Sequence, residues 1–278
     1  MRKHLTTIIL ILLLLTGLSL LLYPTVSDWW NSLHQSRAIA GYTEAVAGLD
    51  GESYDTWWAG AREYNEGLPH KKDRYRMTGE EKEGYESQLN VAGNGIMGYI
   101  EIPRIKCSLP VYHGTDEAVL QVAVGHMAGT SLPVGGGTSH CVLSGHRGLP
   151  SAKLFTDLDQ MEEGDRFMLH VLDETLAYEV DQITVVLPEE VNDLELVEGE
   201  DYCTLVTCTP YGINTHRLLV RGKRTENLPE LQKEQGAGKN GQAEQKGVYS
   251  KQLQALCMAS ILAVPFIIWI IIRRKKKH

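Results

Sequence analysis

The sequence predicts a mostly β fold, a closed or nearly closed barrel preceded by a helical extension. Short apolar and β-branched runs, separated by Gly, Pro and Asp turns, follow one another from residue 95 to residue 224. That stretch shows no long helical pattern, which favours a barrel over a parallel α/β sheet. Two uncharged apolar segments, 5–22 and 253–272, lie on either side of it.

Several runs in this region have the composition of strands. They are CVLSGH, RFMLHVL, TLAYEVDQITVVL, YCTLVTC and HRLLVRG. The strand-like composition begins at GIMGYIEIP. β-Branched and aromatic residues are enriched in strands because they pack well on a pleated surface. Such regularly spaced runs indicate successive strands of one barrel.

The helical extension is predicted from residue 27 to about residue 64. A first helix is expected to end at Asp50 and Gly51, because glycine often follows the last turn of a helix. A second surrounds YDTWWAGAREY, residues 54–64. The polar residues 65–90 are expected to form a loop with one or two helical turns.

The N-terminal apolar segment has the length of a membrane span. Residues 5–22 give about 27 Å of helix, close to the ~30 Å hydrocarbon core of a bilayer. No small-residue cleavage pattern follows, so we expect an uncleaved anchor. Basic residues at both chain ends place both termini in the cytoplasm and the middle outside the cell. The run 225–247 lacks aromatic residues and is predicted to be a disordered linker.

The part between the tails is strongly acidic. Seven of the 27 Lys and Arg lie in the terminal tails and all 35 acids lie between them, which leaves a formal net charge of −15 for residues 24–252. Such a charge argues against nucleic acid as a partner, because phosphates require a basic surface. It is typical of a well-solvated secreted domain.

The sequence does not decide whether its cysteines form disulfides. Before the second apolar segment the chain holds Cys107, Cys141, Cys203 and Cys208, enough for two disulfides in an exported domain. Cys203 and Cys208 are five residues apart in one predicted strand, so they face opposite sides and are not expected to bond to each other. No cysteine–histidine grouping has the spacing of a zinc site, and no metal or cofactor is predicted.

One of these cysteines lies at the end of a predicted hairpin. Cys208 closes the run YCTLVTC, and the turn-prone residues TPYGINT return the chain to a strand that begins at His216 and Arg217. This brings Cys208 beside Arg217, whose guanidinium favours the thiolate and offers donors to an oxyanion. Two interpretations stay open on these grounds: a reactive nucleophile or an inert buried thiol.

A cysteine nucleophile also needs a proton-transfer partner. The predicted exported part contains several histidines, among them His113, His126, His140, His146, His170 and His216. His216 is adjacent to Arg217 and therefore points to the other face of the strand. His146 ends the run CVLSGH just before a loop, where functional residues are often found, and is the preferred candidate.

The runs LSGHRGLPSAKLF and TLVTCTPYGINTHRLLVRGKR resemble the signature of the sortase family: a strand-terminal TLxTC cysteine, an upstream histidine and a downstream arginine. The resemblance covers roughly residues 90–224 and is greatest to the class C, pilus-assembling sortases. It implies a closed eight-stranded barrel flanked by two transmembrane helices. It also implies that Cys208 is the nucleophile, His146 the general acid and base, and Arg217 the residue that holds the substrate carbonyl.

The reaction implied by this resemblance is a transpeptidation. The enzyme would cleave a Leu-Pro-x-Thr-Gly-like sorting signal of a pilin precursor between Thr and Gly, and join the acyl group to a lysine amine of another pilin. Three alternatives stay open. A housekeeping sortase would use a cell-wall precursor as acceptor, a thiol hydrolase would use water, and a partner-binding β domain would carry out no chemistry.

Class C sortases typically carry a lid with an Asp-Pro-aromatic motif. The run DRYR offers Asp73 and Tyr75 for these roles but lacks the proline. The run DTWW, with Asp55 and Trp57, is a rival further upstream. We prefer Asp73 and Tyr75, and a degenerate or missing lid is the remaining alternative.

The predicted organisation follows from these observations. It comprises a membrane anchor (1–23), an extracellular helical segment (24–66), a lid region (67–89), a catalytic barrel (90–224), a disordered linker (225–252), a second transmembrane helix (253–272) and a basic cytoplasmic tail (273–278).

Overall fold

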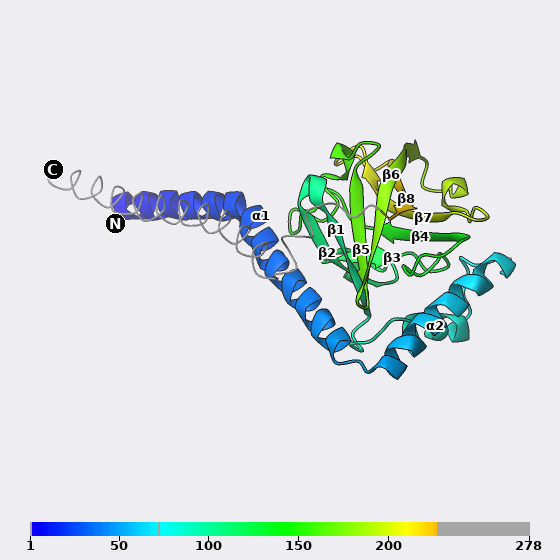
Figure 1. Ribbon diagram of the computed structural model, residues 1–278. Coiled ribbons are helices and arrows are strands. Elements are labelled where there is room, and N and C mark those ends of the chain that lie inside the picture. Colours follow the sequence, from blue (N-terminus) through cyan, green and yellow to red (C-terminus); the bar gives the residue numbers. More distant parts are fainter. Residues whose placement is uncertain (1, 72, 227–278) are drawn as a thin grey trace. The chain divides into compact units, whose positions relative to one another are not determined.

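The computed structural model describes residues 2–71 and 73–226 (Figure 1). Within them, eight strands form a closed barrel in the order β1-β2-β3-β4-β7-β8-β6-β5. The strands are β1 Ile96–Ile102, β2 Cys107–His113, β3 Val124–His126, β4 Ser139–Ser144, β5 Arg166–Val171, β6 Glu174–Val186, β7 Asp201–Thr209 and β8 His216–Thr225. The predicted closed, eight-stranded barrel is thus confirmed.

Strand pairing brings three strand ends together. β1 closes the barrel by pairing antiparallel with both β2 and β5. Most neighbours are antiparallel, but β2 runs parallel to β3 and β4 parallel to β7. Because β4 and β7 are parallel and β8 is antiparallel to β7, the last residues of β4 and β7 meet the first residues of β8 at one end of the barrel.

Apolar side chains fill the barrel. Phe155, Phe167 and Tyr178 have no exposed surface, and burial of such apolar area stabilises the fold by roughly 25 cal/mol per Å². A smaller apolar cluster lies on the outer face, where Leu194 of the β6–β7 connection packs with Val142 and Leu219. The region around β4, β7 and β8 is therefore packed on both of its faces.

Helices precede and interrupt the barrel. They are α1 Arg2–Ala47, α2 Gly51–Gly67, α3 Gly79–Ser87 and α4 Glu117–Leu120, with short 3-10 turns η1 Leu68–His70, η2 Pro103–Ile105, η3 Leu158–Gln160 and η4 Asn192–Leu194. α1 continues through Pro24. The expected helix end at Asp50 and Gly51 is wrong, because these residues begin α2. The Asp50 carboxylate accepts a hydrogen bond from Ser53 N at 2.8 Å, as a preferred N-cap residue does.

Two buried side chains fasten α1 and α2 to the barrel. Tyr42 OH donates to Met97 O at 3.2 Å and accepts from Leu172 N at 2.7 Å. The Asn65 side chain pairs with both backbone groups of Leu132, at 2.7 and 3.1 Å. The helical extension therefore packs on the barrel through satisfied polar contacts, as buried polar groups require.

The polar residues 65–90 contain the expected helical turns. α3 begins with a capping box, in which Thr78 and Glu81 satisfy each other's backbone amides. Tyr85 of α3 is buried, and its hydroxyl accepts from Gly114 N at 2.9 Å and lies 2.9 Å from His126 Nδ1. This tyrosine ties the segment before the barrel to the β2–β3 connection.

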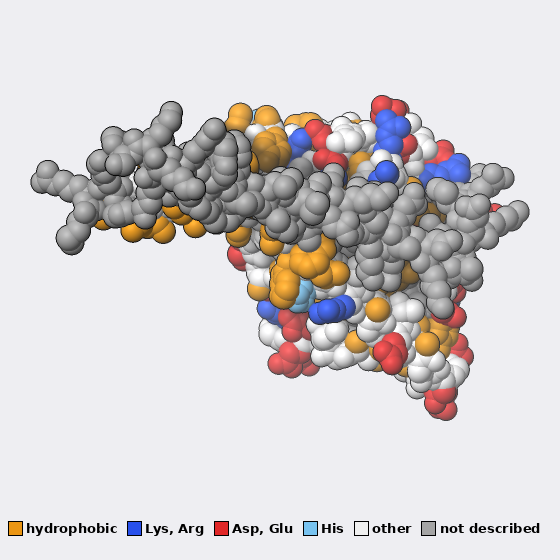
Figure 2. Space-filling view, turned by 90° about the vertical axis from the view of Figure 1, so that its left-hand side faces the viewer, with side chains coloured by type: hydrophobic (Ala, Val, Ile, Leu, Met, Phe, Trp, Pro, Cys, Tyr) orange, Lys and Arg blue, Asp and Glu red, His pale blue; other side chains and the backbone are white. Residues whose placement is uncertain are grey.

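Of the residues described, one helix, within residues 5–47, is long and apolar enough to cross a membrane. A signal sequence passes the same test. Its leucines are widely exposed, Leu20 to 71% and Leu21 to 75%. Figure 2 shows hydrophobic side chains exposed on the face in view, with acidic side chains scattered over it. The predicted second span, the basic tail and nearly all of the linker lie outside the described residues.

Candidate active site

The ends of β7 and β8 place a cysteine opposite an arginine. Cys208 and Arg217 are register partners in this antiparallel pair, and directly opposed residues share one face. Cys203 and Leu205 of β7 belong to the barrel core. Because side chains alternate along a strand, Cys208 lies on the outer face together with Val206. The thiol keeps partial exposure, so the hairpin presents a thiol and a guanidinium together on the outside of the barrel.

β4 brings His146 to the same end of the barrel. Gly145 N donates to Val206 O at 3.0 Å and so extends the parallel β4–β7 ladder. The two chains advance together beyond this point, because parallel neighbours rise equally per residue. Cys208 comes two residues after Val206, and His146 comes two residues after the end of β4. The two residues therefore lie side by side.

The backbone around His146 is fixed on both sides. Thr207 Oγ1 donates to Gly145 O at 2.7 Å, and Phe155 N donates to His146 O at 3.1 Å. A Cβ atom on Gly145 would lie 2.7 Å from Cδ2 of Phe155. Only glycine allows this buried ring to pack under the residue before the histidine.

Arg147 ties the loop after His146 to the end of β7. Its Nη1 donates to Thr209 Oγ1 at 3.3 Å, and its Nη2 pairs with Asp159. The guanidinium carbon lies 5.8 Å from the ring centroid of Tyr211, and the side chain is only 9% exposed. Sequence reasoning missed this positioning residue, although its place directly after His146 was a visible signal.

A carboxylate of the β2–β3 connection faces His146. Glu117 begins α4, and its Oε2 lies 3.6 Å from His146 Nε2. The Glu117 side chain is 71% exposed and the His146 side chain 26%. Gln121 donates a hydrogen bond to Glu117, and this bond together with the nearby imidazole lowers the pKa of the carboxyl group. Sequence reasoning missed Glu117 too, because nothing local connects it with a histidine 29 positions later.

The three predicted catalytic groups are close in the fold but not hydrogen-bonded to one another. Across residues 2–71 and 73–226, no hydrogen bond joins Cys208 to His146 or Arg217. Arg217 Nη1 donates to Asn214 O at 3.3 Å and to His216 O at 3.1 Å. A guanidinium has five donors, more than these bonds use. Catalytic contacts are often long before substrate binds, and the arrangement suits a thiolate nucleophile, a proton carrier and an oxyanion donor.

The other cysteines are poorly placed for attack. Cys141 and Cys203 are buried and are register partners on β4 and β7. The protein around Cys107 desolvates its thiol and raises the pKa to about 12, although the side chain keeps some exposure. All four cysteines of the described region are free thiols, and Cys203 and Cys208 occupy opposite faces of β7.

The other histidines considered from the sequence have structural surroundings. Burial lowers the pKa of His113 and His140, which therefore stay neutral near pH 7. His126 is fully buried. His170 stacks on a tyrosine ring, and His216 lies opposite the last residue of β7 rather than opposite Cys208.

Comparison with known proteins identifies the family. The sortase domain model matches residues 100–225. Sortase D of Bacillus subtilis is 31% identical over 130 residues, which are 46% of this chain and 63% of that protein. The crystal structure of sortase C1 from Streptococcus agalactiae is 50% identical with a TM-score of 0.67, covering 69% of this chain and all of that one. Sortase C of Streptococcus pneumoniae is 42% identical with a TM-score of 0.60, covering 69% and 99%.

The chain belongs to the sortase family. Sortases are cysteine transpeptidases, and the structural neighbours of this one are class C sortases. The matched region runs from β1 to the end of β8 and includes Cys208, His146 and Arg217. In the described part of this sortase, no group of three or more His, Cys, Asp or Glu is arranged to hold a metal ion.

The segment before α3 crosses the outer face of this sortase. We call residues 73–77 the strap. Arg74 of the strap is 8% exposed and donates to Glu195 Oε2 at 2.8 Å and to Leu194 O at 3.4 Å. The Arg74 carbonyl oxygen would lie 2.2 Å from a Cβ atom on Gly129. The strap therefore packs on the loop after β3 and reaches the β6–β7 connection.

The predicted lid residues flank this arginine. Asp73 is exposed, and within the described residues no hydrogen bond or ion pair joins it to Arg217. Tyr75 is half-buried, and burial raises the pKa of its hydroxyl, which accepts from Arg74 at 2.8 Å. The rival pair, Asp55 and Trp57, lies within α2. Sequence reasoning missed Arg74, although it stands between the two residues that we singled out.

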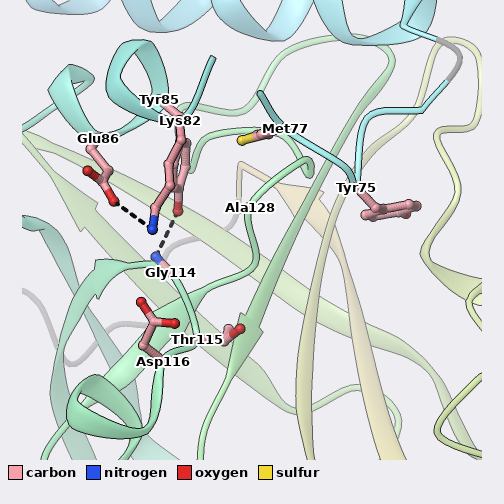
Figure 3. Close-up of a pocket in the computed structure, with 9 residues that line it drawn as sticks. All are labelled: Tyr75, Met77, Lys82, Tyr85, Glu86, Gly114, Thr115, Asp116 and Ala128. Carbon is pink, nitrogen blue, oxygen red and sulfur yellow. Dashed lines mark hydrogen bonds and ion pairs between the residues drawn. The ribbon is translucent and has the colours of Figure 1, made fainter. Parts of the chain in front are cut away.

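A pocket of about 200 Å³ opens between the strap, α3 and the β2–β3 connection (Figure 3). Tyr75 and Met77 line it from the strap side. Lys82 and Glu86 of α3 form an ion pair at 3.6 Å. Asp116, directly before Glu117, contributes a carboxylate from the opposite side. The pocket thus borders the residue before Glu117, the carboxylate that faces His146.

Proposed function

We propose that this sortase cleaves a Leu-Pro-x-Thr-Gly-like sorting signal between Thr and Gly and joins the acyl group to a lysine amine of another pilin. The observation that carries the proposal is the opposition of Cys208 and Arg217 on β7 and β8, with His146 at the end of the neighbouring β4. A second support is the similarity to sortase C of Streptococcus pneumoniae, which is described in terms of pilin substrate specificity.

The first half-reaction forms a thioester. The Cys208 sulfur attacks the carbonyl carbon of the threonine, and Arg217 donates hydrogen bonds to the oxygen as it gains negative charge. The C–N bond to glycine breaks, and the protonated His146 gives its proton to the leaving amine. The acyl group is then held on sulfur, and the imidazole is neutral.

The second half-reaction transfers the acyl group. A lysine amine of the acceptor pilin attacks the thioester carbon, while His146 takes a proton from the attacking nitrogen. The C–S bond breaks and an isopeptide bond remains. Cys208 leaves as a thiolate and His146 as an imidazolium, which restores the starting state.

Membrane attachment fits this chemistry. We infer that residues 1–23 anchor the enzyme, that the barrel lies outside the cell and that both termini are cytoplasmic, as the basic chain ends indicate. Pilin precursors held in the same membrane would meet the enzyme at a raised effective concentration. The apolar character of the helix within residues 5–47 supports the N-terminal anchor.

The strap gives a physical basis for a lid. We propose that region 67–89, with Asp73 and Tyr75, limits access to the outer face of β4 and β7 and opens when a sorting signal binds. The ion pair between the buried Arg74 and the exposed Glu195 supports this role. Gating elements of this kind exclude water and competing nucleophiles from an active site.

Product analysis tests the proposal. The full-length enzyme is incubated with a sorting-signal peptide and a pilin fragment that contains the acceptor lysine, and the products are identified by mass. The proposal predicts mainly the amide-linked product. Predominant hydrolysis despite the amine would indicate a thiol hydrolase, and preference for a cell-wall precursor peptide as acceptor would indicate a housekeeping sortase; either result would contradict the proposal. Repeating the assay with Arg74→Ala tests the lid, because this variant loses the Arg74–Glu195 ion pair and an open lid should increase hydrolysis.

A further inference from the structure

The amine side of the active site can be located from the proposed chemistry. His146 must reach both the amine that leaves in the first half-reaction and the amine that attacks in the second. Both nitrogens therefore occupy nearly the same place, between the thioester carbon on Cys208 and the imidazole. A group that contacts the imidazole of His146 therefore lies close to that place.

Glu117 is such a group. Its Oε2 lies 3.6 Å from His146 Nε2, and the other carboxylate oxygen accepts a hydrogen bond from Gln121, the residue directly after α4. The side chain is 71% exposed, so it buries little and adds little to packing. The Gln121 contact holds the carboxylate in a defined orientation toward the imidazole.

The charge at this position suits a lysine acceptor. A lysine side chain arrives as an ammonium ion near pH 7, and an adjacent carboxylate attracts it, whereas water gains nothing from a negative charge there. Asp116, the residue before Glu117, places a second carboxylate on the same turn in the pocket of Figure 3. An acceptor that approaches from the α4 side therefore meets negative charge before it meets the thioester.

We propose that Glu117 is a specificity-determining residue that favours a cationic amine over an uncharged nucleophile in the second half-reaction, an inference that rests on the proposed transpeptidase function. The ammonium binds beside the carboxylate and loses one proton to solvent. The neutral nitrogen then forms the C–N bond, its second proton passes to His146, and the C–S bond breaks with the electron pair returning to Cys208. Glu117 stays ionised throughout and exchanges no proton.

The effect of Glu117 on the acceptor is electrostatic and acts through an exposed group. It should therefore be modest in size and sensitive to salt.

Two acceptors separate the inference from the proposed function. Full-length wild type, Glu117→Gln and Glu163→Gln are first given the sorting-signal peptide alone, and formation of the acyl-enzyme is followed by intact mass. Each acyl-enzyme then reacts with a lysine-containing peptide or with hydroxylamine, which is uncharged near neutral pH. Glu163→Gln removes the same charge from an exposed residue on the turn before β5 and is the matched control.

In the Glu117→Gln variant, kcat/KM for the lysine peptide should fall about two- to five-fold, the effect usual for an exposed ion pair. Reaction with hydroxylamine should not change, Glu163→Gln should match the wild type, and the difference should shrink in about 1 M salt, where the screening length is about 3 Å. An unchanged kcat/KM for the lysine peptide, or an equal loss with hydroxylamine, would overturn the role of Glu117 alone. Failure of the wild type to form any acyl-enzyme would overturn the proposed function as well.

Discussion

Cys208 differs from the other thiols of the described region in its position on the barrel. Cys141 and Cys203 are enclosed by the core, while Cys208 lies on the outer face opposite a guanidinium. A nucleophile needs access and a nearby positive charge to favour its thiolate. The sequence alone does not decide whether Cys208 is a nucleophile or an inert thiol. The burial of a residue at a strand end depends on which distant parts of the chain pack against that residue.

Replacing this thiol should abolish the reaction without damaging the fold. Cys208→Ala should form no linked product, because no nucleophile remains to carry the acyl group. Its free energy of unfolding should stay within about 0.5 kcal/mol of wild type, as is usual for partly exposed positions. Gel analysis of linked pilin, together with a denaturant titration, checks both expectations. Residual polymer in this variant would remove Cys208 from the mechanism.

Arg217 should resist even a conservative exchange. Lysine keeps the positive charge but loses the planar fork of donors that an oxyanion requires. We expect Arg217→Lys to lower kcat/KM for the sorting peptide by about 100-fold or more, the loss typical of a missing oxyanion donor. Steady-state kinetics measures this directly. Near-wild-type kinetics would show that a point charge is sufficient.

At the scale of elements, the end of β4 depends on one glycine and one buried ring. A methyl group on Gly145 would collide with Phe155, so Gly145→Ala should lower the free energy of unfolding by about 1–3 kcal/mol. Gly137→Ala is the matched control, because a Cβ there meets nothing within 4 Å. Denaturant unfolding of both variants compares them. Equal free energies of unfolding for the two variants would mean that the Phe155 ring moves aside at little cost.

Arg74 joins the strap to the β6–β7 connection, and we expect it to hold the strap in place. Arg74→Ala removes its ion pair with Glu195 and its contact with the β6–β7 connection. Hydrogen exchange of amides in residues 73–77 should become about five-fold faster or more, since local opening governs exchange in such segments. Hydrolysis of the sorting peptide without an acceptor should also increase. Arg76→Ala, at an exposed position within the strap, should leave both rates unchanged.

An unchanged exchange rate in Arg74→Ala would show that other contacts hold the strap. Tyr75 and Met77, which line the adjacent pocket, would then be the residues expected to hold the strap. This outcome would leave the catalytic assignments intact, because these depend on β4, β7 and β8.

The elements that sequence reasoning found, and those that it missed, differ in the range of their contacts. Long strands such as β6 to β8 were predicted from local composition, and the hairpin turn predicted the Cys208–Arg217 pairing. β2 contains Pro110 and β3 has three residues, so neither carries a local strand pattern. The Arg74–Glu195 contact joins residues 121 positions apart, and no local signal reports it.

At the scale of the whole molecule, the acidic charge and the apolar N-terminal helix concern where the enzyme works rather than how. Residues 24–252 carry a net charge of −15, and Figure 2 shows acidic side chains dispersed over one face. Such a domain is well solvated and gains little from polyanions. The resemblance to class C sortases supplied the substrate class, which neither charge nor fold indicates by itself.

We propose that the sulfur of Cys208 carries the acyl group from one amine to the other. The direct measurement is mass mapping of the enzyme after mixing with a sorting-signal peptide in the absence of an acceptor. We expect one adduct with the mass of the fragment up to threonine, located on the peptide that contains Cys208. Added lysine peptide should discharge it as an amide. An adduct on another residue, or linked product formed with no adduct on Cys208, would contradict this proposal.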